Sequence, residues 1–285
     1  MVELIISQVV NGLVWGLILA LISIGLTLIY GQLEIVNVAH GALYTIGAVV
    51  AYYCFAYLGG WAFSIVFSPI ALVILGLIIY GTTIRYSQGK PPIVTVIITY
   101  GLLFIMEQTV FLTYGGVPRS IPNPIPYNVP FIGGDYPVYR IFCAVFSGLV
   151  LLALIVFLKR TRYGLWIRAT RQDHETAMNM GIPVSRVYAL VFCLGSALAG
   201  LGGVLAAPIT SVTFNMGHAI LIDAFIVVIM AGFGSIIGTV VASLIIEVVI
   251  GVSAAFVNPV MARVVGMALM VAVLFIRPEG LFGEE

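Results

Sequence analysis

The sequence predicts an all-α fold, a polytopic transmembrane helical bundle with about eight or nine membrane segments, some of them broken or re-entrant. Of the 285 residues, 62% are hydrophobic and only 8% are charged, and the mean hydropathy is +1.19. This composition lies far from the balance of a soluble domain. Several segments also run for roughly 18 residues or more almost without charge, which is long enough to cross a hydrocarbon core as helices.

The apolar runs define the expected helices in order along the chain, within a single transmembrane domain over residues 1–285. We expect helices over residues 5–30, 41–58, 61–84, 92–114, 138–158, 188–207, 219–232, 236–256 and 260–276. Residues 115–137 lie between the fourth and fifth helices and carry repeated prolines and paired glycines. These residues oppose a regular helix, so we expect an aqueous loop there.

The distribution of Lys and Arg predicts how the bundle is oriented. Basic residues gather in two loops that the span count places on one side: Arg85, Lys90, Lys159, Arg160, Arg162, Arg168, Arg171 and Arg186. Only Arg119 and Arg140 flank the proline-rich loop. The positive-inside rule therefore predicts that residues 159–187 are cytoplasmic and residues 115–137 are external. The side on which Met1 lies stays open, because a broken segment near residues 31–40 would reverse it.

A dense polar cluster interrupts the apolar chain within "GQLEIVNVAHGALYTIGA", residues 31–48. A second glycine-punctuated apolar stretch, "MAGFGSIIGTVVASLI", spans residues 230–245 in the other half of the chain. Interrupted apolar segments at corresponding positions are typical of the substrate region of transporters, where freed backbone groups line a cavity. The alternative is close helix packing through small residues. The candidate pathway residues are Asn37, His40, Gly41, Tyr44, Gly47, Gly232 and Gly234.

Asn37 and His40 have two open roles. They could hydrogen-bond a polar solute, or they could satisfy backbone groups where a helix is broken. Both roles predict a local break in the helix. His40 has little support as a metal ligand, because His174 and His218 lie in other loops. The sequence therefore predicts no metal site.

The longest polar stretch, residues 159–190, contains a short helix that we expect from Thr170 to Gly181. Gly181, followed by Pro183, ends the run. A short amphipathic helix in a cytoplasmic loop suits the groove of a soluble partner. The alternative is a solvated connector.

Within that helix, "ETAMNMG" resembles the EAA-x3-G loop of ABC-transporter permeases, in which a short helix docks into a cleft of the ATPase subunit. Four further stretches are similar to branched-chain amino-acid permeases of the LivH type and follow the same order: residues 11–48, "LAGLGGVLAAPI", "DAFIVVIMAGFGSIIGT" and "RPEGLFG". The resemblance covers nearly the whole chain. One departure is Ala231 before Gly232, where such permeases commonly have a glycine pair.

The resemblance implies a permease subunit of a binding-protein-dependent importer in the bacterial inner (plasma) membrane. It implies as partners a second homologous permease, two cytoplasmic ATPase subunits and an external solute-binding protein. The residues expected to couple to the ATPase are Arg168, Arg171, Asp173, Glu175, Ala177 and Gly181. The sequence has no GxxxxGK[ST] phosphate loop, so this chain is expected to bind no cofactor and ATP with Mg is expected on the partner ATPases. The expected solutes are branched-chain or other hydrophobic amino acids, with urea, short amides or another small solute as the alternative.

Other function classes receive less support. The basic residues are few and scattered, which does not suggest nucleic-acid binding, and Cys54, Cys143 and Cys193 are isolated. Paired carboxylates and a serine elbow are missing, so an enzyme is not expected. The remaining rival is a gradient-driven carrier or channel, since the intramembrane acids Glu107, Asp223 and Glu247 could mark an ion route. Such a carrier would not need an ATPase-docking helix.

Overall fold

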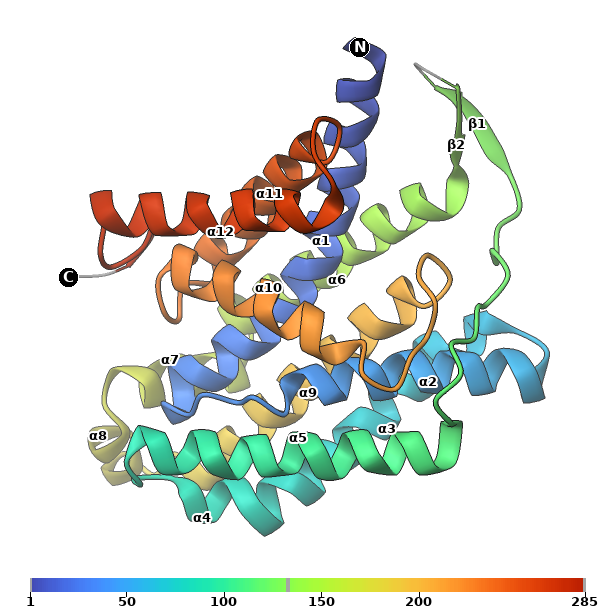
Figure 1. Cartoon of the computed structure of the whole chain (residues 1–285). Coiled ribbons are helices and arrows are strands. Elements are labelled where there is room, and N and C mark those ends of the chain that lie inside the picture. Colours follow the sequence, from blue (N-terminus) through green and yellow to red (C-terminus); the bar gives the residue numbers. More distant parts are fainter. Residues whose placement is uncertain (1, 132–133, 284–285) are drawn as a thin grey trace.

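The computed structural model describes residues 2–131 and 134–283 of the chain (Figure 1). Its elements are α1 (Val2–Leu33), α2 (His40–Leu58), η1 (Trp61–Phe63), α3 (Ser64–Ile79), η2 (Tyr80–Ile84), α4 (Arg85–Ser87), α5 (Pro92–Tyr114), β1 (Asn128–Phe131), β2 (Gly134–Pro137), α6 (Val138–Arg160), α7 (Arg162–Gln172), α8 (His174–Asn179), α9 (Val184–Ala206), α10 (Gly217–Ala231), α11 (Ile236–Ser253) and α12 (Pro259–Ile276).

The described residues form eight helices that are long and apolar enough to cross a membrane, counting η1 to α4 as one, and α10 is a shorter apolar helix of 15 residues. The expected polytopic bundle of eight or nine segments is therefore confirmed. We call the end of the bundle that holds α7 and α8 the basic end, and the end that holds the β1–β2 hairpin the hairpin end (Figure 1). The positive-inside rule predicts that the basic end is cytoplasmic.

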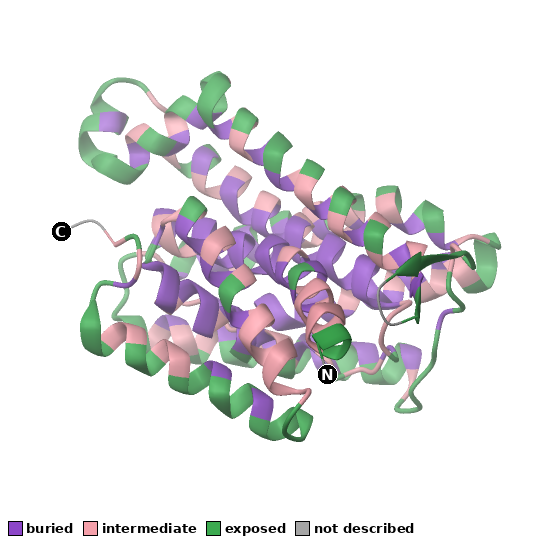
Figure 2. Ribbon diagram, turned by 90° about the horizontal axis from the view of Figure 1, so that it is seen from above, coloured by how far each residue is buried: buried purple, intermediate pink, exposed green. Residues whose placement is uncertain are grey.

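Helices α1 and α9 form the centre of the bundle. In α1, 83% of the residues in the most apolar 18-residue stretch are buried. In α12, at the periphery, only 11% of the residues in such a stretch are buried. Buried residues gather in the middle of the molecule and exposed ones follow the outer helices (Figure 2). Many exposed side chains on the outer helices are apolar, such as Ile97 and Leu149. This pattern fits helices whose outer faces meet lipid, where a polar surface would be costly.

The start of α1 is fixed at the hairpin end by two contacts. Asn11 Oδ1 accepts a hydrogen bond from the Tyr136 hydroxyl at 3.0 Å and another from the Arg140 guanidinium. Helix α1 runs from the hairpin end to the basic end, and α2 runs back (Figure 1). The break between α1 and α2 therefore does not place the start of α1 at the basic end. Val2 therefore lies on the side of the loop 115–137, which is the external side if the basic end is cytoplasmic.

Three local expectations needed correction. The segment 61–84 is not one regular α-helix, because it begins with a turn of 3₁₀-helix and widens into a π-helix at Tyr80–Ile84. The described residues of the loop 115–137 contain no helix, as expected, but they include an antiparallel hairpin that pairs Asn128 with Pro137 and Val129 with Tyr136. The expected helix from Thr170 to Gly181 is divided at Asp173, which has extended backbone angles (φ −159°, ψ 108°).

Candidate functional site

The polar cluster at residues 31–48 contains a break between two helices. Helix α1 ends at Leu33, α2 begins at His40, and residues 34–39 between them are not helical apart from a turn. Glu34, the first residue of the break, has φ 55°, a left-handed conformation that is uncommon for residues other than glycine. The local break predicted from the sequence is therefore confirmed.

A contact with α5 fixes the depth of this break. The Thr99 hydroxyl donates a hydrogen bond to the carbonyl oxygen of Val36 at 3.0 Å and accepts one from the backbone N–H of Val38 at 3.2 Å. Thr99 is the eighth residue of α5, so it lies about 10 Å from the start of that helix at 1.5 Å per residue. The break therefore lies inside the bundle, and not in a surface loop.

Asn37 and His40 are both fully buried, at 0% exposure. The His40 Nε2 atom lies 2.9 Å from the carbonyl oxygen of Ile22 on α1. His40 Nδ1 and both polar side-chain atoms of Asn37 have no hydrogen-bond partner among the described residues. Buried polar atoms without partners are rare and costly, and they cluster at sites that change shape or bind ligands. In this conformation neither side chain is accessible to solvent.

The candidate glycines of α2 lie where helices pack closely. A Cβ atom on Gly41 would stand 2.6 Å from the carbonyl oxygen of Gly217, and one on Gly47 would overlap the backbone of Gly200. Tyr44 is 3% exposed, and its own carbonyl oxygen occupies the space that a Cβ on Gly203 would need. These contacts favour the packing alternative for Gly41 and Gly47.

Gly232 and Gly234 form the turn between α10 and α11 at the basic end. Both have positive φ angles, 91° and 85°, which favour glycine. Residues near the C-terminus close this turn, since the backbone N–H groups of Leu281 and Phe282 donate to the carbonyl oxygens of Met230 and Ala231 at 2.8 and 3.0 Å. A Cβ on Gly232 would stand 2.8 Å from the Glu279 carbonyl oxygen. The turn is therefore a packed junction.

The two stretches with interrupted helices approach each other. A small apolar cavity of about 130 Å³ lies between Val36 in the break and Phe233 in the α10–α11 turn. Tyr30, one turn before the end of α1, also has its ring centroid 4.4 Å from that of Phe233. The structure thus brings together the segments that the sequence marked separately, although through apolar side chains and not through Asn37 or His40.

Helix α7 lies against the ends of α1, α6 and the α10–α11 turn. The Arg168 guanidinium donates to the carbonyl oxygen of Leu158, and Arg171 Nη1 donates to that of Gly234 at 2.9 Å. Gln32 Nε2 at the end of α1 donates to the Ile167 carbonyl oxygen at 2.9 Å. Arg168 and Arg171 therefore already hold backbone groups of this chain, which limits how far they can serve as free contacts for a partner.

Helix α8 is short and is capped at both ends. The Asp173 carboxylate accepts hydrogen bonds from the backbone N–H groups of Glu175 and Thr176 at 2.9 and 3.0 Å. A hydrogen bond from the Thr176 hydroxyl lowers the pKa of Asp173 and keeps this cap ionised. At the other end Gly181 has φ 83°, and the Ile182 N–H donates to the Ala177 carbonyl oxygen at 3.0 Å. This is the Schellman arrangement.

The α8 residues expected to couple to a partner divide into two groups. Ala177 is 3% exposed and packs beneath the helix, and Gly181 supplies the positive φ of the cap. Glu175 is exposed, and no cation lies within 4.0 Å of its carboxylate among the described residues. Ala177 and Gly181 therefore shape α8, whereas Glu175 is free to meet another molecule.

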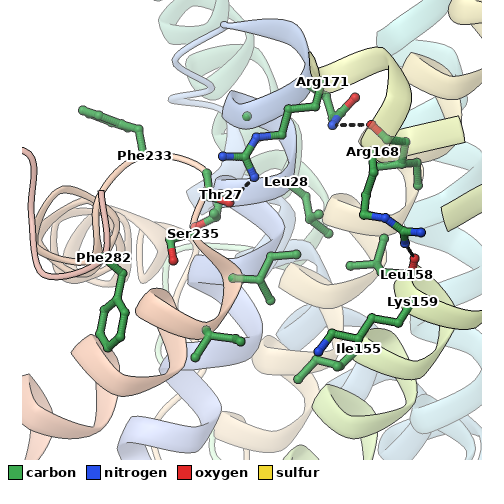
Figure 3. Close-up of a pocket in the computed structure, with 16 residues that line it drawn as sticks. Thr27, Leu28, Ile155, Leu158, Lys159, Arg168, Arg171, Phe233, Ser235 and Phe282 are labelled. Carbon is green, nitrogen blue, oxygen red and sulfur yellow. Dashed lines mark hydrogen bonds between the residues drawn. The ribbon is translucent and has the colours of Figure 1, made fainter. Parts of the chain in front are cut away.

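A cavity of about 480 Å³ lies beside α7 (Figure 3). Arg168 and Lys159 border it on one side, and Ser235 and Phe282 border it on the other (Figure 3). Arg171 and Gly234, which the sequence assigned to two separate candidate sites, both line it. The cavity thus joins the loop 159–187 to the second glycine-rich stretch.

Two of the three intramembrane acids have partners on neighbouring helices. Glu107 Oε2 on α5 lies 2.9 Å from His218 Nε2, and Asp223 Oδ2 on α10 lies 3.8 Å from Arg263 Nη2 on α12. Glu247 makes no ion pair among residues 2–131 and 134–283. No group of three or more His, Cys, Asp or Glu side chains that could hold a metal ion is found in the described part of the chain.

Sequence reasoning missed Gln32 and Thr99 as residues that hold the break in place. Gln32 was visible as part of the polar cluster, but its partner on α7 lies 135 positions away. Thr99 is one of several threonines in the apolar helix α5, and nothing in the sequence distinguishes it from the others. His218 and Arg263 were also missed as partners of acids, and only their placement on neighbouring helices reveals them.

Residues 8–274 match the family described as the permease component of the branched-chain amino acid transport system. The chain belongs to this family. The eight membrane-spanning helices agree with membership, and the expected multi-pass membrane localisation is confirmed. The resemblance found in the ordered motifs therefore identified the right family.

Curated permeases match the chain over almost its full length. It is 30% identical to the high-affinity branched-chain amino acid transport system permease protein LivH of Salmonella typhimurium and, to the same extent, to BraD of Pseudomonas aeruginosa. Each match covers 98% of this chain and 96% of the relative. The ribose import permease protein RbsC of Escherichia coli is 26% identical over 71% of the chain and 59% of its own length. No solved structure gives a significant match.

Proposed function

We propose that this permease forms the translocation path for branched-chain or other hydrophobic amino acids in a binding-protein-dependent ABC importer. Full-length similarity to permeases whose names specify branched-chain amino acid transport supports this solute class. In this proposal the permease pairs with a second homologous permease in the bacterial inner membrane and alternates between inward-open and outward-open states. Two partner ATPases bind ATP and Mg and supply the energy, and an external binding protein delivers the solute.

The observation that carries the proposal is the surface of α8. At the basic end this capped helix exposes Glu175 together with Met178 and Met180, which are 58% and 80% exposed. Exposed methionines beside a carboxylate suit a cleft on a soluble partner, because methionine adapts to irregular apolar surfaces. Since Asp173 and Gly181 fix both ends, α8 is preorganised for docking, which lowers the entropic cost of binding. The expected docking role of Arg168 and Arg171 becomes indirect: they hold α7, and α7 carries α8.

Proteoliposomes that contain the permease with its partner permease, ATPases and binding protein provide the test. Leucine uptake is expected to require ATP and binding protein and to persist when the proton gradient is collapsed. Glu175→Gln is expected to reduce uptake and stimulated ATP hydrolysis while the complex still reaches the membrane. Glu3→Gln makes the same change at the hairpin end and is the matched control. Uncoupler-sensitive uptake by this chain alone would falsify the proposal.

The solute class is tested separately in the same vesicles. Ala231, fully buried at the end of α10, stands where permeases of this type commonly have the first glycine of a pair. Because of this difference, urea and short amides stay the second candidate class of solute. Unlabelled leucine, isoleucine and valine are expected to compete with labelled leucine, and urea, acetamide and ribose are not. Competition by urea or acetamide alone would transfer the assignment to that class and leave the ABC mechanism intact.

A further inference from the structure

We propose that the cavity beside α7 is a binding site for the phosphate of an anionic phospholipid headgroup. The cavity lies between the end of α1, the last turns of α6, the helix α7 and the α10–α11 turn. The exposed residues of α8, Glu175, Met178 and Met180, do not line this cavity. The proposal rests on the charge of the cavity, on an unpaired buried polar atom and on the depth of the site.

The cavity is strongly cationic. Lys159, Arg168 and Arg171 line it, and none of its lining residues within 2–131 and 134–283 is acidic. Among the described residues, no carboxylate lies within 4.0 Å of any of these three cations. Arg168 and Arg171 each use a donor on one backbone carbonyl, but a guanidinium has five N–H donors, so several remain for an anion. Three unneutralised cations around one cavity favour a phosphate ligand.

A second observation points to a ligand in the same place. Gln32 lines the cavity and is 7% exposed. Its Nε2 atom donates to the Ile167 carbonyl oxygen, whereas its Oε1 atom has no hydrogen-bond partner in the described part of the chain. An unprotonated phosphate oxygen cannot satisfy a carbonyl oxygen, but the hydroxyl groups of a glycerol headgroup can donate to it. The cavity also meets the N-terminus of α11 at Ser235 and Ile236, where the helix dipole favours an anion.

The depth of the cavity favours a lipid as the source of the phosphate. Lys159 lies in the last turn of α6, where the apolar helix ends. On α7, Tyr163 and Trp166 pack edge to face with ring centroids 5.4 Å apart, and such aromatic residues mark the headgroup level of a bilayer. Phe233 and Ile237 line the cavity and are 51% and 55% exposed, so they offer an apolar surface to acyl chains. Basic pockets between helices at a cytoplasmic surface are suited to anionic headgroups.

The test measures lipid retention by the purified, detergent-solubilised permease with native mass spectrometry. Phosphatidylglycerol is expected to be retained more strongly than phosphatidylcholine of the same acyl chains, and added salt is expected to weaken its retention. Lys159→Gln is expected to lower the apparent affinity for phosphatidylglycerol about five-fold, the effect of one basic residue near the membrane surface. Lys90→Gln removes the same charge from an exposed position at the basic end and is expected to change the affinity less than two-fold.

Inorganic phosphate distinguishes the two sources of the ligand. Millimolar phosphate that leaves phosphatidylglycerol bound supports the lipid assignment, whereas displacement by sub-millimolar phosphate overturns it in favour of a soluble anion. Equal retention of the two lipids, equal affinity of wild type and Lys159→Gln, or retention that is insensitive to salt would each overturn the proposal. The wild-type lipid and salt comparisons need no variant, and none of these measurements depends on transport.

Discussion

The guanidinium of Arg171 donates a hydrogen bond to the carbonyl oxygen of Gly234 at 2.9 Å, across 63 positions of sequence. This contact ties the loop that carries α8 to the turn between α10 and α11. A partner that pushes α8 would therefore act through α7 on a turn in which Gly232 and Gly234 have positive φ angles that few residues other than glycine adopt. The contact provides a direct physical connection between the two regions.

Arg171→Ala removes this connection. Uptake by the reconstituted complex is expected to fall about tenfold, which corresponds to the loss of one charge-assisted hydrogen bond near the lower end of its usual strength. The measurement is leucine uptake together with ATP hydrolysis stimulated by binding protein. Arg186→Ala removes an exposed arginine of the same loop and should retain at least half of the wild-type rate. Equal effects of the two changes would exclude a special role of the Arg171–Gly234 bond.

The Asp173 cap predicts a pH dependence of α8. The pKa of Asp173 is lowered from its ordinary value of 3.8 by the hydrogen bond from the Thr176 hydroxyl. Its contribution to stability is therefore complete above that value and is lost as the pH falls through the lowered pKa. Hydrogen exchange of the Glu175 and Thr176 amides, corrected for the intrinsic rate, should accelerate only below about pH 4. Asp173→Asn keeps an oxygen cap without a titrating group, so a similar acid response in that variant would contradict this cause.

Gly181→Ala tests the cap at the other end of α8. Because Gly181 has φ 83°, an alanine there is expected to destabilise the local structure by about 1 kcal/mol. Hydrogen exchange at the Ile182 amide, which is bonded to Ala177, reports the change directly. Gly181→Asn should recover part of the protection, since asparagine tolerates the left-handed region better. Because nothing lies within 4 Å of a Cβ atom at Gly181, an asparagine variant no better than alanine would contradict the φ angle as the cause.

Gly47→Ala tests the packing role of α2. Its new Cβ would overlap the backbone of Gly200, so we expect a loss of about 1 to 3 kcal/mol, measured as a lower midpoint of thermal unfolding in detergent. Gly148→Ala on α6 is the control, because nothing lies within 4 Å of a Cβ there. If Gly47→Ala unfolds like the wild type but transports poorly, the solute-contact alternative regains support.

Asn37→Leu separates stability from transport at the helix break. Replacing two unpartnered buried polar atoms is expected to stabilise the permease by about 1 to 3 kcal/mol, whereas Thr99→Val removes bonded polar atoms and should destabilise it. If Asn37 meets solute or water in another state of the cycle, the stabilised variant loses uptake. Unchanged uptake kinetics would restrict Asn37 to a structural role.

The positions of the helices could be predicted from sequence because hydrophobicity, proline and glycine act locally. Residues 92–114 form a helix with the expected bounds, since Pro92 suits the first helical position and Gly115 follows the last. The break at residues 34–39 was also predictable from its polar residues. The division at Asp173 could have been found, because aspartate is a preferred N-cap residue.

Contacts between distant parts of the chain could not be predicted in this way. Nothing near Gln32 indicates Ile167 as its partner, and nothing near Gly234 indicates Arg171. Asn37 and His40, which could hydrogen-bond a solute, are fully buried in this structure, and their place in the solute pathway stays a prediction. The spacing of apolar residues predicts where a helix lies, but it does not show which face of an apolar helix packs against which neighbouring helix.

The contacts of Leu281 and Phe282 with the end of α10 also have a consequence for biosynthesis. The carbonyl groups of Met230 and Ala231 receive their partners from residues about fifty positions further along the chain. During translation, α10 and α11 therefore enter the membrane while this turn is still open. The junction beside Arg171 can close only after residues 280–282 have left the ribosome, so a nascent permease truncated before them would lack the hydrogen bonds that close the α10–α11 turn.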